Sequence, residues 1–265
     1  MARQDMTLTE RQVQIAEMIR ETDFLDVESL SDRFKVTTQT IRRDLNTLCD
    51  QGLARRRHGG VEKPLNTDNL TYSSRLILNN AAKKAIAREV ARAIPNGASL
   101  AFSIGTTPEV VAEALLGHEA LTIFTNNLNV AILACSNPSF EVTIVGGTIR
   151  NGDLDILGAE VSDFFAAYKV DFGIYGVAGV DEDGGLLDFH AHEVAARQAI
   201  RENCRQSVLV LDAGKFSRRA HVRGGRIEEA DLVFCDRRPP EGIVERLAAG
   251  DATLTVCGPN GRGDR

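Results

Sequence analysis

The segment 37–60 constrains the fold of this chain more than any other. Its sequence is TTQTIRRDLNTLCDQGLARRRHGG. The first half has helical period, because Ile41, Leu45 and Leu48 lie at i, i+4 and i+7 and form one apolar face. At about 100° per residue, the opposite face carries polar side chains. These are Gln39, Arg43, Asn46 and Asp50, flanked by Arg42 and Thr47. Such side chains can pair with base edges and phosphates in a major groove.

The ends of this helix, and the residues that follow it, indicate a DNA-binding unit. Thr37 is a suitable N-cap, and Gly52 is expected to end the helix as its C-cap. Residues 53–61 then form a short strand, a basic turn closed by Gly59 and Gly60, and a returning strand. The alternative is an ordinary solvated helix followed by a charged loop. The tight glycine turn favours a basic wing beside a reading helix.

Two shorter helices precede the reading helix. The first is expected at 8–21, and the second at 27–34 with Asp26 as its N-cap. Only residues 35–36 separate the second helix from the third, so the connection must be a tight turn. Two helices, a minimal turn and a basic third helix predict a helix-turn-helix, and the wing makes it a winged helix-turn-helix over residues 1–63.

The distribution of charge supports this interpretation. The whole chain has a net charge of −6, which is unusual for a protein that binds nucleic acid. Residues 1–32 have a net charge of −5, however, and residues 33–63 have a net charge of +5. The positive charge therefore coincides with the reading helix and the wing. A local basic patch of this kind, rather than the total charge, governs binding to DNA.

The remainder of the chain predicts an α/β domain. Residues 64–78 have turn residues and no clear period, so they are expected to be a linker. From residue 79 to 257, helices alternate with strands, which implies an open, mostly parallel sheet covered on both faces. The tail 258–265 is expected to be disordered. The expected strands are 99–102, 121–124, 141–145, 171–177, 207–211, 232–235 and 253–257, and the expected helices are 79–94, 108–116, a helix ending near 135, 158–168, 192–204 and 242–249.

Polar loops follow several of these strands, at the sheet edge where ligands bind in such folds. Gly105, Thr106 and Thr107 open a helix, and free backbone N–H groups with a positive dipole end suit a phosphate. Asn126 and Asn127, which follow the next strand, contribute side-chain amides to the same edge of the sheet. The remaining candidates are Gly147, which permits close backbone approach, and the cations Arg150 and Lys215. Each feature alone is more often a turn, a cap or a solvated lysine. Together they predict a small phosphorylated ligand.

Other classes of protein are disfavoured. Five widely spaced cysteines, with no C-x-x-C pair, indicate neither a disulfide framework nor a zinc ribbon. His190, His192 and His221 lack a partner at the usual ligand spacing, so we expect no metal and no cofactor. The chain has no apolar run long enough to span a membrane and no apolar N-terminal segment, which predicts a cytoplasmic protein.

The chain resembles the DeoR family of bacterial transcription regulators over about residues 6–257. The family signature TxxTIRRDLxxLxxxGLxxRxHGG matches residues 37–60. The C-terminal half is similar to the family's sensor domain, whose fold looks like those of ribose-5-phosphate isomerase and the CoA-transferases. Four further stretches carry the resemblance: IGTTPEVVAEALL (104–116), TNNLNVA (125–131), DFGIYGVAGVDEDGGLLDFHAHEV (171–194) and DAGKF (212–216).

The resemblance implies a repressor that binds double-stranded operator DNA as a homo-oligomer, a dimer or a tetramer. A small phosphorylated polyol, with sn-glycerol 3-phosphate as the expected ligand, would release it from genes of glycerol catabolism. The implied base and backbone contacts are Thr38, Gln39, Thr40, Arg42 and Arg43, the implied phosphate contacts are Arg55, Arg57 and His58, and the outward Asn46 joins them. The implied effector contacts are Gly105, Thr106, Thr107, Asn126, Gly147, Arg150 and Lys215, with Ser103 and Asn127 beside them.

Two positions depart from the family pattern. Ser103 stands where the family usually has aspartate, and Gly214 stands where it usually has serine. A regulator of the same type that responds to another sugar phosphate therefore stays an alternative. A second alternative is an isomerase-like enzyme that uses carboxylates such as Asp181, Asp183 and Glu193, although the fused DNA-reading unit argues against an enzyme. The residues do not distinguish a repressor from an activator.

Overall fold

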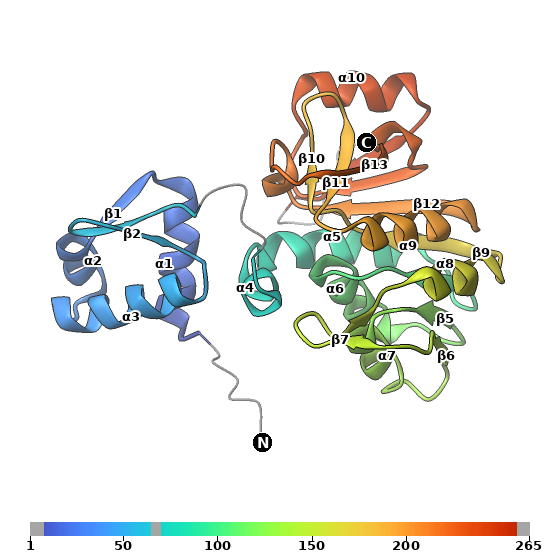
Figure 1. The fold of residues 1–265 in the computed structure, drawn as a ribbon, viewed down its shortest axis with the longest axis horizontal. Coiled ribbons are helices and arrows are strands. Elements are labelled where there is room, and N and C mark those ends of the chain that lie inside the picture. Colours follow the sequence, from blue (N-terminus) through green and yellow to red (C-terminus); the bar gives the residue numbers. More distant parts are fainter. Residues whose placement is uncertain (1–7, 65–69, 259–265) are drawn as a thin grey trace. The chain divides into compact units, whose positions relative to one another are not determined.

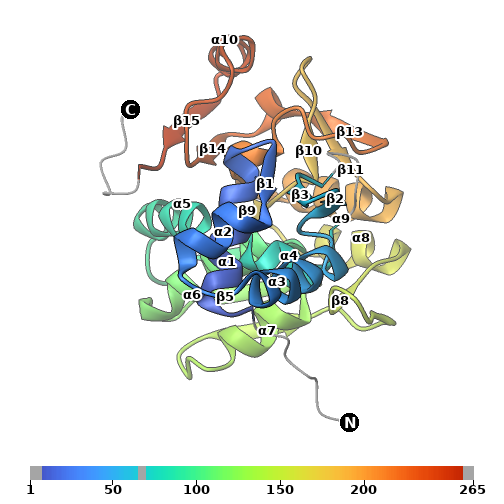
Figure 2. The same cartoon turned by 90° about the vertical axis from the view of Figure 1, so that its left-hand side faces the viewer.

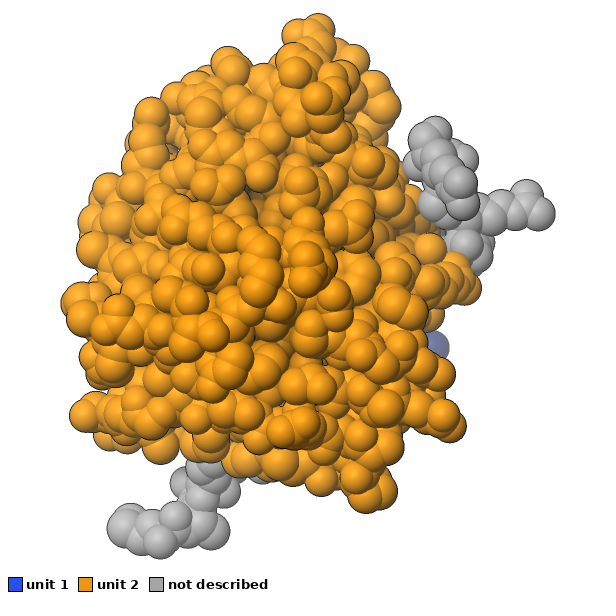
Figure 3. Space-filling model, turned by 90° about the vertical axis from the view of Figure 1, so that its right-hand side faces the viewer, with its two compact units in different colours: residues 1–79 blue, residues 80–265 orange. Residues whose placement is uncertain are grey.

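The computed structural model describes residues 8–64 and 70–258, so the N-terminal residues, part of the expected linker and nearly all of the expected tail lie outside the described residues. The chain forms two compact units, Met1–Asn79 and Asn80–Arg265 (Figure 1). Figure 3 shows one face of the second unit, in orange. Each has its own buried apolar cluster. The two units are therefore described separately.

The first unit is a winged helix-turn-helix. The three predicted helices are present, and Thr9 caps the first of them in a reciprocal pair of hydrogen bonds with Gln12. A short strand that sequence reasoning missed, β1, pairs with β3 and completes a three-stranded antiparallel sheet in the order β1-β3-β2. The elements are α1 (Glu10–Glu21), β1 (Phe24–Asp26), α2 (Val27–Phe34), α3 (Thr38–Asp50), β2 (Arg55–Arg57), β3 (Gly60–Glu62) and α4 (Tyr72–Ile77).

Apolar residues from all three helices and from the sheet form the core of this unit. The predicted inward residues Ile41, Leu45 and Leu48 of α3 are buried there. The helix α4 corrects the expectation of an irregular linker at 64–78. Thr71 caps it, and the Ser74 hydroxyl donates a 2.5 Å hydrogen bond to the backbone oxygen of Gln51. Residues Ile77 and Leu78 pack against the same core.

The second unit is built on a seven-stranded parallel sheet in the order β15-β14-β12-β9-β4-β5-β6 (Figure 1). The chain adds strands outward from β4 to β6 and then returns to place β9 on the other side of β4. The order thus reverses between β4 and β9, which is where ligands bind in open α/β sheets. Every strand end agrees with the prediction to within three residues. The strands are β4 (Ser99–Phe102), β5 (Thr122–Thr125), β6 (Glu141–Ile144), β9 (Val170–Tyr175), β12 (Cys204–Leu211), β14 (Leu232–Cys235) and β15 (Thr253–Val256).

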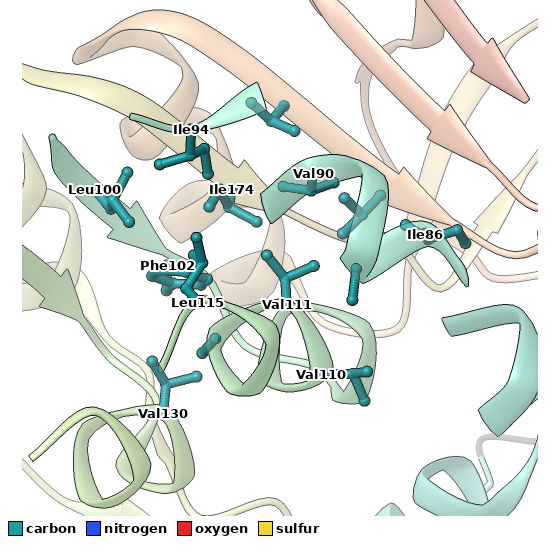
Figure 4. Close-up of a cluster of buried hydrophobic side chains, with 14 of the residues drawn as sticks. Ile86, Val90, Ile94, Leu100, Phe102, Val110, Val111, Leu115, Val130 and Ile174 are labelled. Carbon is teal, nitrogen blue, oxygen red and sulfur yellow. The ribbon is translucent and has the colours of Figure 1, made fainter. Parts of the chain in front are cut away.

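Helices cover both faces of this sheet, as the alternation predicts. On one face, Ile86 and Val90 of α5 and Val111 of α6 pack against Phe102 of β4 and Ile174 of β9 (Figure 4). A second cluster on the other face is formed with α8, α9 and α10. The helices are α5 (Asn80–Ala93), α6 (Thr106–Ala114), α7 (Leu128–Ala134), α8 (Ala159–Ala166), α9 (Ala191–Glu202) and α10 (Glu241–Ala249), with short 3₁₀ turns at Leu115–Gly117, Ala213–Lys215 and Ile227–Glu229.

Two small antiparallel elements were expected to be loops. One is a three-stranded sheet of β10 (Gly179–Val180), β11 (Gly185–Asp188) and β13 (Val222–Arg226). The other is the hairpin of β7 (Ile149–Arg150) and β8 (Asp155–Ile156). Their strands are short and rich in glycine and charged residues, so they lack the apolar pattern that reveals a strand. Figure 2, turned by 90° from Figure 1, labels β8, β10, β11 and β13 of these elements. Within the described residues, no helix combines the length and the apolar character that a membrane crossing requires.

Candidate DNA-binding surface and effector site

Local hydrogen bonds fix both ends of α3. The Thr37 hydroxyl accepts a hydrogen bond from the backbone N–H of Thr40 at 3.2 Å. At the other end, the backbone N–H of Leu53 bonds the oxygen of Leu48 at 2.8 Å, and Gly52 has a φ of +71°. Glycine adopts this left-handed conformation without a steric penalty. Gln51 is the C-cap, so the helix ends one residue earlier than predicted, and Gly52 is the residue after the cap.

The outward face of α3 is polar and accessible, as predicted. The side chains of Gln39, Arg42, Arg43 and Asn46 are exposed. Thr38 and Thr40, at the start of the helix, are half-buried. Their contacts with DNA stay predictions, but the helix presents the expected set of donors and acceptors to solvent.

A buried ion pair fixes α3 against α1. Asp44 accepts hydrogen bonds from Arg11 Nε at 2.6 Å and from Gln12 Nε2 at 2.9 Å. The Asp44 residue is only 5 % exposed. Its hydrogen bond raises the pKa of Arg11 above the usual arginine value. Sequence reasoning missed this contact, although Asp44 interrupts the apolar side of α3 between Ile41 and Leu45 and so signalled a buried polar partner.

The wing places its basic residues on two faces. Arg55, Arg57 and His58 are exposed, as the predicted phosphate contacts require. In β2, however, Arg56 pairs in register with the buried Val61 and so lies on the other face. Arg56 is nevertheless exposed. Burial raises the pKa of the Cys49 thiol, and the charge of Arg56 opposes this rise. Sequence reasoning did not assign a role to Arg56.

Gly60 is required by close packing in the wing. A Cβ atom at this position would lie 2.0 Å from the backbone oxygen of Leu25 in β1. The neighbouring Gly59 has a φ of +81° and closes the two-residue turn between β2 and β3. The missed strand β1 thus explains Gly60, and the conformation of the turn explains Gly59.

In the second unit, the loop after β4 lies at the point where the strand order reverses. The backbone N–H of Ser103 donates to the oxygen of Ile174 in β9 at 3.0 Å, and the Ser103 residue is 2 % exposed. Gly105 has a φ of +114° and is the N-cap of α6 without a side-chain cap. The helix begins at Thr106, so Pro108 occupies its third position instead of the predicted first. That position also lacks an intrahelical donor, so proline is tolerated there.

Thr106 and Thr107 are both buried in the first turn of α6, as are Asn126 and Asn127 after β5. The Asn126 amide donates to the backbone oxygen of Ile156 at 2.9 Å, whereas its side-chain oxygen is fully buried without a hydrogen-bond partner. A buried unpaired acceptor is costly, and a ligand hydroxyl could satisfy it.

Asn127 has structural bonds at both ends of its amide. Its oxygen caps α7 by accepting from the backbone N–H of Asn129 at 2.9 Å. Its nitrogen donates to Glu109 of α6 at 2.9 Å. The structure therefore uses Asn127 to join α6 and α7, and its expected effector contact stays a prediction.

Arg150 is surrounded by carboxylates. Its guanidinium forms two hydrogen bonds with Asp155, at 2.9 and 2.6 Å, one with Glu193 at 2.9 Å, and an ion pair with Asp153 at 3.1 Å. Burial disfavours the charged form, but the bonds to Asp155 and Glu193 outweigh it and raise the pKa of Arg150. Arg150 thus links the β7–β8 hairpin to the start of α9. Its expected contact with the effector stays a prediction.

The other two candidates lie in loops at the same carboxyl edge. Gly147 follows β6 with a φ of +151°, and a Cβ atom there would lie 2.8 Å from the side chain of Ile156. Lys215 follows β12 in the 3₁₀ turn Ala213–Lys215, where Asp212 accepts from the backbone N–H of Gly214 at 3.0 Å. Lys215 is half-buried.

Two family models cover most of this chain. The DeoR-like helix-turn-helix domain matches residues 11–66, and the DeoR C terminal sensor domain matches residues 78–237. The chain belongs to the DeoR family.

Several curated relatives match this DeoR-family chain over nearly its whole length. The glycerol-3-phosphate regulon repressor of Escherichia coli (strain K12) is 42% identical over 252 residues, which is 95% of this chain and 100% of the relative. The repressor of the same name from Haemophilus influenzae is 44% identical over 247 residues, covering 93% and 96%. The transcriptional repressor CsqR of Escherichia coli is 36% identical over 247 residues, covering 91% and 95%.

Solved structures match this DeoR-family chain much more weakly. Ribose 5-phosphate isomerase A from Methanocaldococcus jannaschii has a TM-score of 0.40 and 14% identity, over 53% of this chain and 56% of the isomerase. The carboxylates of the enzyme alternative have structural partners here. Asp181 and Asp183 form ion pairs with Arg223, and Glu193 binds Arg150 and caps α9. Within the described part of the chain, no three His, Cys, Asp or Glu side chains come together as a metal site would require.

Sequence reasoning missed a further buried ion pair in this DeoR-family regulator. Arg197 of α9 is 2 % exposed and binds Asp188 through Nε at 3.2 Å and Nη2 at 3.0 Å. Nη2 also donates to the backbone oxygen of Gly224 at 2.6 Å. Asp188 in turn accepts from the backbone N–H of Ala178, in the loop after β9. The pair therefore supports the strand end where the sheet order reverses.

Proposed function

We propose that this protein is a cytoplasmic transcriptional repressor of genes for glycerol and glycerol 3-phosphate catabolism. It binds operator DNA as a symmetric oligomer, and each winged unit contacts one half-site. The observation that carries this proposal is the 42% identity over the full length of the Escherichia coli glycerol-3-phosphate regulon repressor. The exposed polar face of α3 and the basic wing support the DNA-binding part.

We further propose sn-glycerol 3-phosphate as the effector. The first turn of α6, with Gly105, Thr106 and Thr107, would receive the phosphate, and Lys215 would neutralise part of its charge. Asn126, whose buried oxygen has no partner, would accept a hydrogen bond from a polyol hydroxyl. Binding releases DNA only if the ester prefers the conformation that does not bind the operator, with a typical coupling of about 1–3 kcal/mol.

The experiment that tests both parts is fluorescence anisotropy with DNA from upstream of glycerol-uptake genes. We expect binding without ligand, release by sn-glycerol 3-phosphate, and no release by free glycerol. The variant Lys215→Met should keep DNA binding and lose the response to the ester. Lys169→Met is the matched control, because Lys169 precedes β9 at the opposite edge of the sheet and donates to the backbone oxygen of Glu202. Absence of operator binding in every condition would reject the proposal.

A second candidate is a regulator of the same type that responds to a different sugar phosphate. Ser103 favours this candidate, because it is buried at the point of reversal in the place where the family usually has aspartate. A thermal-shift screen of phosphorylated polyols, ketoses and deoxyribose phosphates separates the two, since a ligand that binds only the native state raises the melting temperature. A larger shift with a sugar phosphate than with sn-glycerol 3-phosphate would favour the second candidate.

A further inference from the structure

Two of the three wing arginines are bound to the same carboxylate. Arg55 Nε donates to Glu62 Oε1 at 2.7 Å, and Arg55 Nη2 contacts the same oxygen. Arg57 Nη1 lies 3.5 Å from the other oxygen, Glu62 Oε2. The guanidinium of Arg57 also lies 5.4 Å from the centre of the Phe24 ring. One carboxylate therefore engages both of the arginines that are expected to contact phosphates.

The register of the wing sheet produces this arrangement. Arg55 pairs with Glu62, and Glu62 pairs with Phe24 on its other side, so all three lie on one face of the sheet. Arg57 lies two residues after Arg55 and returns to the same face. The Glu62 side chain is 19 % exposed, whereas those of Arg55 and Arg57 are 55 % and 61 % exposed. Glu62 is thus held at the base, and the arginines reach toward solvent.

We infer that Glu62 is an internal competitor for the phosphates of DNA and sets how strongly the wing binds. This inference rests on the proposed binding of operator DNA. A phosphate oxygen requires the same guanidinium N–H groups that Glu62 now occupies. Exposed ion pairs of this kind are individually weak, so a phosphate can displace the carboxylate or share the arginine with it. In either case the negative charge of Glu62 remains next to the DNA backbone and lowers the affinity.

The consequence concerns affinity in general, not the recognition of one base sequence. Phosphate contacts position a protein on DNA without reading its sequence. Glu62 should therefore weaken binding to operator and to unrelated DNA by similar factors. It should also reduce the dependence of affinity on salt, because a neutralised arginine releases fewer counterions from DNA.

The test is the variant Glu62→Gln in the full chain, measured by anisotropy on operator and on scrambled DNA over a range of potassium chloride concentrations. We expect binding about 3- to 10-fold tighter at low salt on both DNAs. The slope of log affinity against log salt should steepen by up to about one. Asp23→Asn is the matched control, since Asp23 is fully exposed and pairs at 3.6 Å with Lys63 instead of with Arg55 or Arg57. It should change affinity less than 2-fold, because an exposed pair contributes little and this pair includes neither Arg55 nor Arg57.

A double-mutant cycle distinguishes competition from a simple change in net charge. In a background with Arg55→Ala and Arg57→Ala, the gain from Glu62→Gln should fall below about 2-fold, because both arginines that Glu62 binds are gone. An equal gain in both backgrounds, or no gain in the native background, would overturn the inference. If the unmodified protein binds no operator at all, the proposed function fails instead. Thermal melting of each variant shows that its wing is folded. The variant Glu62→Asp shortens the reach of the carboxylate and provides a second measurement of the competition.

Discussion

The first unit (Met1–Asn79, the winged unit) and the second unit (Asn80–Arg265, the sensor unit) use polar residues in opposite ways. In the winged unit, the candidate DNA contacts on α3 and the wing are exposed and extend from a small apolar core. In the sensor unit, the candidate effector contacts Ser103, Thr106, Thr107 and Asn126 are buried, and Asn127 and Arg150 already bind other side chains. DNA can therefore reach these side chains directly, and the existing bonds of Arg55 and Arg57 to Glu62 are exposed and weak. An effector must enter a network of existing bonds, and such an exchange can change the conformation of the unit.

The largest effect should come from breaking the buried pair of the sensor unit. Arg197→Met leaves Asp188 buried without its partner, so we expect a loss of about 3–5 kcal/mol in the unfolding free energy of the sensor unit. Arg201→Met, on the same helix, is the control, because the Arg201 side chain is 29 % exposed and forms a long ion pair with Glu229 at 3.5 Å. Denaturant unfolding measures both. If the winged unit loses stability equally, the two units are not energetically separate.

A smaller effect is expected from the buried pair of the winged unit. Asp44→Ala should cost about 3 kcal/mol, at the low end for a broken buried pair, because the Arg11 side chain is 30 % exposed and can reach water. Asp50→Ala, on the exposed side of α3, should change stability by less than about 0.5 kcal/mol. Unfolding followed by circular dichroism measures both, and equal effects would show that the bond to α1 does not hold α3.

The next effect concerns recognition and not stability. Arg43→Ala removes an exposed side chain from the reading face, so operator binding should weaken by about 2 kcal/mol while unrelated DNA is bound nearly as before. Footprinting and anisotropy on both DNAs give the ratio. An unchanged ratio of affinities for operator and unrelated DNA, with an unchanged melting temperature of the protein, would reject the assignment of Arg43 to base reading. Gln39 and Asn46 would then be the next candidates.

The smallest effect is a dependence on acid. Hydrogen bonds from the backbone N–H and hydroxyl of Ser99 lower the pKa of Asp171. A carboxyl group whose pKa is lower in the folded state stabilises the fold above its unfolded pKa, near 3.9, and loses this contribution as the pH falls through the folded value. Asp171→Asn should flatten the acid limb of the stability curve, by less than about 1 kcal/mol. Melting curves from pH 6 to pH 2 measure this change, and an unchanged acid limb would contradict it.

Much of the fold could be predicted because it follows from apolar periodicity. The three helices of the winged unit and the seven strands of the parallel sheet all have a regular apolar pattern. The misses share a physical cause. Strand β1 has three residues, all half-buried, and it exists through its pairing with β3, a partner distant in sequence. Helix α4 is capped by Thr71 and is held through Ser74 by a backbone oxygen of another element.

The residues of the candidate sites likewise divide into those that local spacing predicts and those that depend on distant partners. Residues such as Gln39 and Arg43 could be placed from helical spacing alone, because exposure depends on the angle around one helix. The bonds of Arg150 to Asp155 and Glu193 could not be predicted, since they join the β7–β8 hairpin to α9 across the fold. The same holds for Arg11 with Asp44. Sequence patterns identify which polar residues lie near an edge or on a face, but not which of them already bind one another.

The position of β9 in the sheet has a consequence for synthesis of the chain. This strand completes the centre of the sheet by pairing with β4, yet it is made after β5 and β6. A ribosome adds about 5–20 residues per second, so a nascent chain carries β4 with one unpaired edge for several seconds. An unpaired edge can join another chain. The winged unit is complete well before that time, which means that a truncated or stalled product would contain the DNA-binding part without a finished sensor.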